Sequence, residues 1–391
     1  MSATPPAEST DFPLARDDLW FRIQRALRLI PADGGDGVIR RMMLFPLIAW
    51  LPLVVWAVAT GHAIDSETGE PLLRHLGIHV RFLVALPLLI LGERLARGVM
   101  AKLLPRFIQR NLVTEEKEPA FRQVIADTAR LKNSTLPWIA IGGVILLIVL
   151  LPGSGQFLDE LDWAREDGKL GAGGWWYLAV SRPLFQVFLF GWLWRIVLLG
   201  VLLKRIAGIG LDLVPTHPDR LGGMGFISSF PRVFMPLALA TSCILAAHWA
   251  HEILWHGAHV TAFKMQGVTF LVVIVLLCLA PLAVFMKALK RARGRALGEY
   301  SLLIGRHGRM VHDKWIAGSP PEDEALLDAP ELGCTADINA IYGEVVAMKK
   351  HPFTKLSLIP ILVAAALPLL VVTAIDLPLG ELLGKLLKIL V

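Results

Sequence analysis

The sequence predicts an all-α fold: a polytopic membrane protein with about seven transmembrane helices and a small cytoplasmic helical layer. The first supporting observation is composition, because 55% of the 391 residues are hydrophobic and the mean hydropathy is +0.58, whereas soluble domains contain about 45–50% apolar residues. The second is that these residues gather in seven stretches, each near the ~20 residues that cross a bilayer as a helix. The third is that Lys and Arg are concentrated in alternate loops, which orients the crossings.

The expected crossings are residues 42–60, 79–95, 136–151, 176–203, 233–254, 267–286 and 356–375. Most of the 39 Lys and Arg residues lie before the first crossing or after the second, fourth and sixth, whereas the other loops are acidic, as at Asp65, Glu67 and Glu70. Because cationic loops stay on the cytoplasmic side, the N-terminus is expected in the cytoplasm and the C-terminus outside. We therefore expect a multi-pass protein of a bacterial-type inner (plasma) membrane.

The same pattern divides the chain into four regions. They are a cytoplasmic N-terminal segment (1–41), a six-helix transmembrane region (42–286) with a cytoplasmic helical loop (97–135), a cytoplasmic helical region (287–355), and the seventh crossing with an outer amphipathic tail (356–391). In the first region, Leu19, Ile23, Leu27 and Ile30 share one helical face. This face predicts either an interfacial helix on anionic lipid or a helix packed on the cytoplasmic layer.

Composition also excludes some classes of protein. The net charge of +6 and the pI near 9.3 suit a nucleic-acid partner, but the basic residues flank apolar stretches and are explained by topology. No nucleic-acid binding is therefore expected. The three cysteines, Cys243, Cys278 and Cys334, have no CxxC spacing, so neither a disulfide framework nor a thiolate metal site is expected.

Histidines gather at the outer end of the fifth expected crossing, in the run HWAHEILWHGAH. At about 100° per residue, the potential ligands share one broad helical face. They are His248, His251, Glu252, His256 and His259. Imidazole and carboxylate groups at these spacings suit a transition metal such as Zn or Fe, and histidine also titrates near neutral pH. The alternative is a set of interfacial histidines that hydrogen-bond to water, lipid headgroups or neighbouring helices.

The order HxxHE in this run is not the HExxH of metalloproteases. It resembles one histidine box of the membrane di-iron hydroxylases and desaturases, a family that carries several such boxes on cytoplasmic helix ends. Here the run is expected to face outward, and His75, His79 and Arg81 at the outer mouth of the second crossing lie at a similar depth. A shared outer site is therefore a hypothesis.

A second motif, LVPTHPDRLGGMGF (213–226), lies between the fourth and fifth crossings. Its polar groups and glycines are His217, Asp219, Arg220, Gly222, Gly223 and Gly225. Glycines that adopt positive φ can expose backbone N–H groups, so the loop is expected either to cradle an anion or re-enter the membrane, or to form a tight turn capped by Asp219. It has no GKS or GKT and is not a Walker loop.

Two arginines, Arg182 and Arg195, lie within the fourth crossing. A guanidinium in hydrocarbon is costly and normally faces the bundle interior or a carboxylate. Arg182 is near the outer interface and can extend to it, whereas Arg195 is deeper. Glu93, at a similar depth in the second crossing, is its expected partner, either in a structural ion pair or on an ion pathway.

These features predict an inner-membrane ion channel or transporter, with lipid and an ion or small solute as partners and cytoplasmic helices that pack across subunits of a homo-oligomer. The alternative is a membrane-embedded metalloenzyme acting on a lipid or quinone, with His248, His251, Glu252 and His256 as ligands. The sequence contains no complete catalytic set, so the first prediction is preferred.

Overall fold

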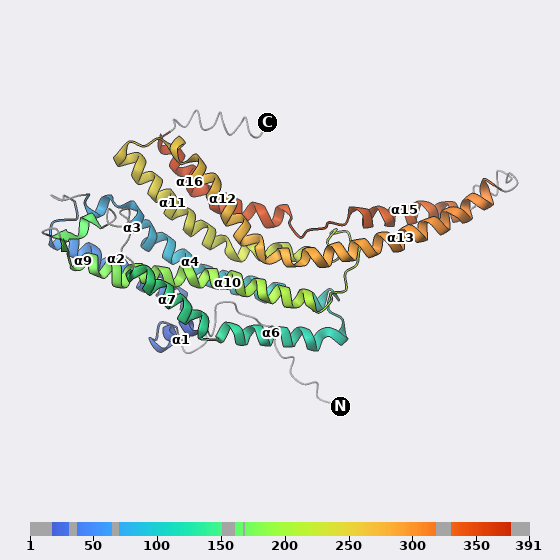
Figure 1. Cartoon of the computed structure of the whole chain (residues 1–391), viewed down its shortest axis with the longest axis horizontal. Coiled ribbons are helices and arrows are strands. Elements are labelled where there is room, and N and C mark those ends of the chain that lie inside the picture. The colour runs from blue at the N-terminus through green and yellow to red at the C-terminus, as the bar shows by residue number, and fades with distance from the viewer. Residues whose placement is uncertain are drawn as a thin grey trace, which may run out of the picture.

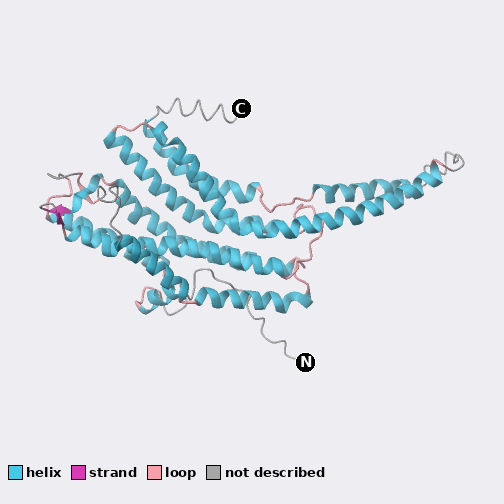
Figure 2. Cartoon of the chain, viewed as in Figure 1, coloured by secondary structure: helices cyan, strands magenta, loops and turns pink. Residues whose placement is uncertain are grey.

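The computed structural model describes residues 18–30, 37–64, 70–150, 161–166, 169–317 and 330–376. The expected outer tail after residue 376, and Asp65 and Glu67, lie outside these residues. Within them the chain is almost entirely helical (Figure 2), with one short antiparallel strand pair, β1 (Arg165–Glu166) and β2 (Lys169–Leu170).

Seven helical segments among the described residues are long and apolar enough to cross a membrane, which confirms the predicted fold class. They are Val38–Ala59, Leu76–Gln109, Glu115–Leu150, Ala172–Gly208, Gly225–His256, Val260–Trp315 and Lys355–Ile375. Each contains one of the seven expected crossings or nearly so. Hydropathy predicts these segments because each helix that crosses lipid must itself consist mainly of apolar residues.

The first three spans and the helix before them contain the following elements. They are α1 (Leu19–Ala26), α2 (Val38–Ala59), η1 (Leu72–Arg74), α3 (Leu76–Val80), the π-helix η2 (Arg81–Ala85), α4 (Leu86–Leu103), α5 (Arg106–Gln109), η3 (Glu115–Lys117), α6 (Glu118–Asn133) and α7 (Leu136–Leu150).

The remaining elements continue in the same way. They are η4 (Asp162–Ala164), α9 (Ala172–Trp176), the π-helix η5 (Tyr177–Ser181), α10 (Arg182–Gly208), η6 (Gly225–Phe234), α11 (Met235–His256), η7 (Val260–Phe263), α12 (Lys264–Leu279), η8 (Ala280–Phe285), α13 (Met286–Trp315), α15 (Pro330–Ala347) and α16 (Lys355–Asp376).

The spans lie side by side in one elongated bundle, and α13 with α15 extends beyond it as a helical hairpin (Figure 1). We call this the hairpin end. The opposite end, where α3 begins and α11 terminates, carries His75 and His251 and is called the histidine end. The long helices α11 and α16 pack against each other along the bundle.

Two of the spans contain a π-helical turn that ends two residues before a proline. These turns are η2, which precedes Pro87, and η5, which precedes Pro183. Proline removes a backbone donor from the helix, and π-turns are inserted where regular helix bonding is interrupted. The two turns are neighbours, because the guanidinium of Arg81 donates a hydrogen bond to the hydroxyl of Tyr177.

At the hairpin end, α6 packs along α10 and forms the predicted small helical layer. It buries Phe121 and Ile125 of its apolar face. The ring of Phe107 contacts those of Phe121, Phe226 and Phe285, with centroids 5.0–6.3 Å apart. This aromatic cluster ties α5, α6, η6 and η8 together, because buried aromatic pairs stabilise beyond their burial alone.

Candidate functional site

A buried ionic network joins three spanning helices toward the hairpin end. Glu93 of α4 receives one arginine on each carboxylate oxygen: Arg195 Nη2 lies 2.7 Å from Oε1, and Arg41 Nη1 lies 2.7 Å from Oε2. All three residues are no more than 2% exposed. The Glu93 network, as we call it, consists of these three residues together with Asp18 and Gln24 of the α1 region.

Close packing of α4 brings Glu93 to the arginines. Gly92, its neighbour, leaves no room for a side chain, since a Cβ there would lie 2.6 Å from Trp192 Cζ2 and 2.8 Å from Pro236 Cβ. The indole Nε1 of Trp192 donates to the Leu89 carbonyl at 3.0 Å. The guanidinium carbon of Arg195 lies 5.2 Å from the Trp192 ring centroid, a distance at which the ring face attracts a cation.

The N-terminal helix α1 covers the network. Asp18 caps this helix by accepting from the Phe21 N–H at 2.7 Å, and its other oxygen lies 3.9 Å from Arg195 Nη2. Gln24 Oε1 accepts from Arg41 Nη1 at 2.9 Å. Burial raises the pKa of the Asp18 carboxyl above its ordinary range, and the nearby charge of Arg195 lowers it in part.

The packing of α1 divides the apolar face expected from the sequence. Of that face, Ile30 is buried, whereas Ile23 and Leu27 are 41% and 63% exposed. The helix also buries Phe21 and Gln24 against the protein. Trp20 packs between α2 and α10 on the rings of Phe45 and Phe188. Helical periodicity could not show that the polar Gln24 would be buried, because its partner Arg41 lies on another helix.

The Glu93 network contains more hydrogen-bond donors than acceptors. Among the described residues, Nε and Nη1 of Arg195 and Nε of Arg41 have no acceptor, although these atoms are buried. A guanidinium is always charged, so Glu93 neutralises one of the two arginines and Asp18 is the nearest further carboxylate. Buried polar groups are normally paired, which makes this excess of donors the unusual chemical feature of the site.

The ion pair expected between Glu93 and Arg195 is thus present, whereas Arg41 and Asp18 were not predicted as members of the site. Arg41 resembles any cationic residue that flanks a crossing. Arg182 lies at the first turn of α10, about 20 Å along the helix axis from Arg195 at 1.5 Å per residue. It therefore does not join the network.

The loop 213–226 forms a capped turn. The carboxylate of Asp219 accepts from the backbone N–H groups of Leu221, Gly223 and Gly225 at 2.8, 3.1 and 2.7 Å. Gly222 and Gly223 have φ of +66° and +91°, as their lack of Cβ allows. The N–H groups that the motif offers to an anion are therefore occupied by its own aspartate.

The two other polar residues of this motif extend its contacts. His217 Nδ1 lies 3.1 Å from Asp219 Oδ1, and Arg220 Nε lies 3.9 Å from Glu344 Oε2 of α15. The carbonyl of Arg220 accepts from the Lys349 N–H at 2.8 Å. The loop thus anchors the base of the hairpin to the bundle.

The five potential ligands expected in the fifth crossing do not meet at one point. His248 lies against Phe263, with ring centroids 6.4 Å apart. His259 follows Gly257, whose φ of +65° ends α11. His256 Nδ1 lies 3.6 Å from Glu252 Oε2, on the same helix.

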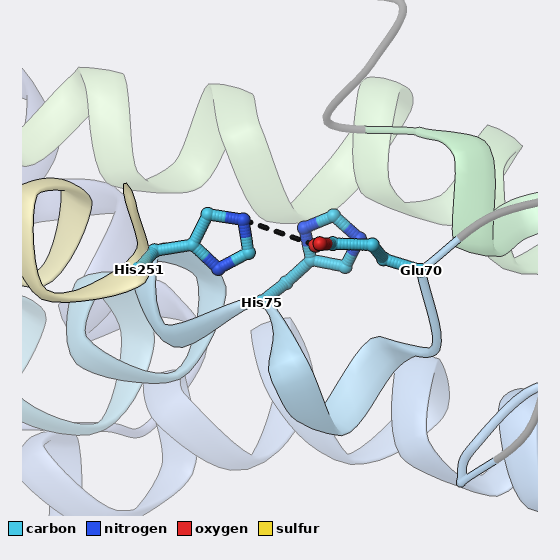
Figure 3. A group of neighbouring side chains, drawn as sticks. All are labelled: Glu70, His75 and His251. Atoms are coloured by element: carbon cyan, nitrogen blue, oxygen red, sulfur yellow. Dashed lines mark ion pairs between the residues drawn. The ribbon is translucent and has the colours of Figure 1, made fainter. Parts of the chain in front are cut away.

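His251 instead meets residues from the segment before α3. The metal-ligating atoms of Glu70, His75 and His251 all lie within 4.8 Å of one another (Figure 3). His251 Nε2 is 3.0 Å from Glu70 Oε2, and His256 Nε2 is 3.6 Å from Glu70 Oε1. Glu70 was missed as a ligand because in the sequence it belongs to an acidic loop far from the histidine run.

Comparisons of this chain with protein-family models, with curated proteins and with solved structures found no match.

Proposed function

We propose that this multi-pass membrane protein is a channel or transporter that carries a small anionic solute past the Glu93 network. The observation that carries the proposal is the pair of buried arginines, Arg41 and Arg195, whose donors outnumber the acceptors around them among the described residues. Charged side chains inside a membrane protein are costly, and they commonly mark the route of an ion or substrate.

The excess positive charge favours an anion over a cation. Glu93 is the only carboxylate within 3 Å of either arginine among the described residues, and Asp18 is at 3.9 Å from Arg195. A chloride, phosphate or carboxylate that enters the network would accept from the unpaired Nε and Nη1 groups. A cation would meet two guanidinium groups and be repelled.

In this proposal, α1 closes the pathway from the hairpin end. Asp18 and Gln24 supply oxygens that compete with an anion for the same arginines. The cationic loops at the hairpin end support a cytoplasmic position for this end and an outer position for the histidine end, in a bacterial-type inner membrane. Release of α1 would expose the network to cytoplasmic solute.

The test is flux in liposomes that contain the purified full-length protein, with chloride, phosphate and acetate as alternative anions and potassium as the cation. We expect anion flux, and we expect Arg195→Lys to lower it by about tenfold or more, because lysine lacks the guanidinium donors that face the unpaired side. Arg130→Lys is the matched control, since Arg130 forms an exposed pair with Asp127.

Two outcomes would reject the proposal. Potassium flux without anion flux would contradict the inferred charge preference. Unchanged anion flux in an Arg195→Lys protein that elutes as a single folded species would remove the network from the pathway.

A homo-oligomer is part of the same proposal. The hairpin carries exposed apolar side chains, among them Leu302, Met310 and Ile341 at 64%, 62% and 44% exposure, and a second subunit would cover them. The metalloenzyme acting on a lipid or quinone stays a prediction, since its expected ligands do not converge on one centre.

A further inference from the structure

At the histidine end, the ring of His251 lies between two groups that accept hydrogen bonds. Nδ1 is 3.1 Å from the carbonyl oxygen of Arg74, and Nε2 is 3.0 Å from Glu70 Oε2. A carbonyl oxygen only accepts, so Nδ1 must carry a proton. A neutral imidazole has one N–H, and its Nε2 lone pair would then point at a carboxylate.

His79 shows what a satisfied neutral histidine looks like in the same region. Its Nδ1 accepts from Trp50 Nε1 at 2.8 Å, and its Nε2 lies 3.1 Å from the Leu72 carbonyl. One donor and one acceptor match the two nitrogens of a neutral ring. His251 has no such match, so its contact with Glu70 needs either a proton or a metal ion between the two atoms.

A third ligand lies beside this contact. The His75 ring is 9% exposed and nearly parallel to that of His251, with an interplanar angle of 15° and centroids 5.6 Å apart. Figure 3 shows the Glu70 carboxylate and the two rings converging from α11 and from the segment before α3. A single proton needs no third ligand atom, whereas a transition metal does.

We propose that Glu70, His75 and His251 bind a divalent transition metal, with Zn²⁺ as the best match. Two imidazoles and one carboxylate form a ligand set of zinc sites that keep a fourth position open. His256, whose Nε2 is 3.6 Å from Glu70 Oε1, or a water molecule takes that position. The site is independent of the proposed anion pathway and lies at the other end of the bundle.

The contact between His251 Nδ1 and the Arg74 carbonyl supports this assignment. Metal-ligating histidines usually donate their other N–H to a carbonyl or carboxylate, which fixes the tautomer and the ring orientation. Here that bond directs Nε2 toward Glu70. A bound metal would clamp the segment before α3 to the last turns of α11, and thus hold two spans together at their outer ends.

Zinc binding to the full-length protein tests the proposal. Protein stripped with a chelator and titrated with Zn²⁺ by calorimetry is expected to bind one ion per chain. Glu70→Gln, His75→Ala and His251→Ala should each weaken binding by roughly 100-fold or more, since even the loss of a residue that only hydrogen-bonds to a metal ligand costs ~10–100-fold. His256→Ala should weaken it less. His248→Ala is the control, because this residue lies on the same helix against Phe263.

A thermal-shift measurement guards against misfolded variants: Zn²⁺ should raise the melting temperature of the wild type and of His248→Ala, and leave that of folded His251→Ala unchanged. Absence of stoichiometric Zn²⁺ binding to the wild type would overturn the proposal. Equal loss of affinity in His248→Ala would place the metal elsewhere.

Discussion

Glu93 and Glu70 lie in two regions of the molecule that use a carboxylate in different ways. Glu93 is 2% exposed and holds two arginines, whose charge is permanent. Glu70 has a side chain 29% exposed and contacts two histidines, whose charge depends on a proton or a metal. The first region is therefore built around fixed charges, whereas the charge of the second depends on what its histidines bind.

The largest difference between the two regions is expected when each glutamate is neutralised in turn. Glu93→Gln removes the carboxylate that pairs with both buried guanidinium groups, and breaking a buried ion pair in this way costs about 3–5 kcal/mol. Glu70→Gln in metal-free protein should change the free energy of unfolding by less than ~1 kcal/mol, as for exposed pairs. Unfolding by SDS titration in mixed micelles measures both.

Each variant is the control for the other, because both replace a glutamate by a glutamine of the same shape. Equal losses in the free energy of unfolding would show that the ion pairs of Glu93 stabilise the fold no more than the contacts of Glu70 do. That result would also remove the main support for a charged pathway between α2, α4 and α10.

A smaller effect is expected from the glycine that positions Glu93. Gly92→Ala places a Cβ 2.6 Å from Trp192 Cζ2, and overpacking of this kind costs about 1–3 kcal/mol. Gly98→Ala on the same helix has nothing within 4 Å of the added Cβ and should be neutral or slightly stabilising, since alanine favours helix. Parallel SDS titrations compare them; a neutral Gly92→Ala would mean that α4 can shift without cost.

Much of the fold could be predicted because the relevant signals are local. Each crossing is a continuous apolar stretch, and the pairing of Glu93 with Arg195 follows from their similar depths in two crossings. The π-turns before Pro87 and Pro183 could not be predicted, because proline also occurs within uninterrupted helix here, at Pro46 for example.

The sites were harder to predict because their members come from distant segments. Asp18 and Arg41 join Glu93 only after α1 folds back on the bundle. Glu70 meets His251 because η1 and α3 place the end of an acidic loop beside α11. Helical periodicity describes the face of one helix and contains no information about which other segment will cover it.

The smallest expected effect is a change in the packing of α1 with pH, which depends on Asp18. This residue is a titratable group inside a network whose arginines are always charged. Burial raises its pKa, Arg195 and Lys132 lower it, and Glu93 raises it, with burial the largest influence. The pKa of Asp18 in the folded protein lies above the ordinary value of 3.8. The carboxyl group therefore makes its full contribution to the packing of α1 on the bundle when the pH is below 3.8, where it is protonated. The contribution is lost as pH rises through the raised pKa.

Docking of α1 should therefore loosen as pH rises from about 4 toward neutrality. A spin label on an Arg28→Cys variant, with Cys334→Ser to remove the exposed native thiol, reports the mobility of the end of α1. Asp18→Asn keeps an N-cap oxygen but cannot ionise, so its label should show the same mobility across the pH range. If the label in the Asp18→Asn variant still changed its mobility with pH, a group other than Asp18 would control the packing of α1. The Glu93 network would then contain no group that responds to pH.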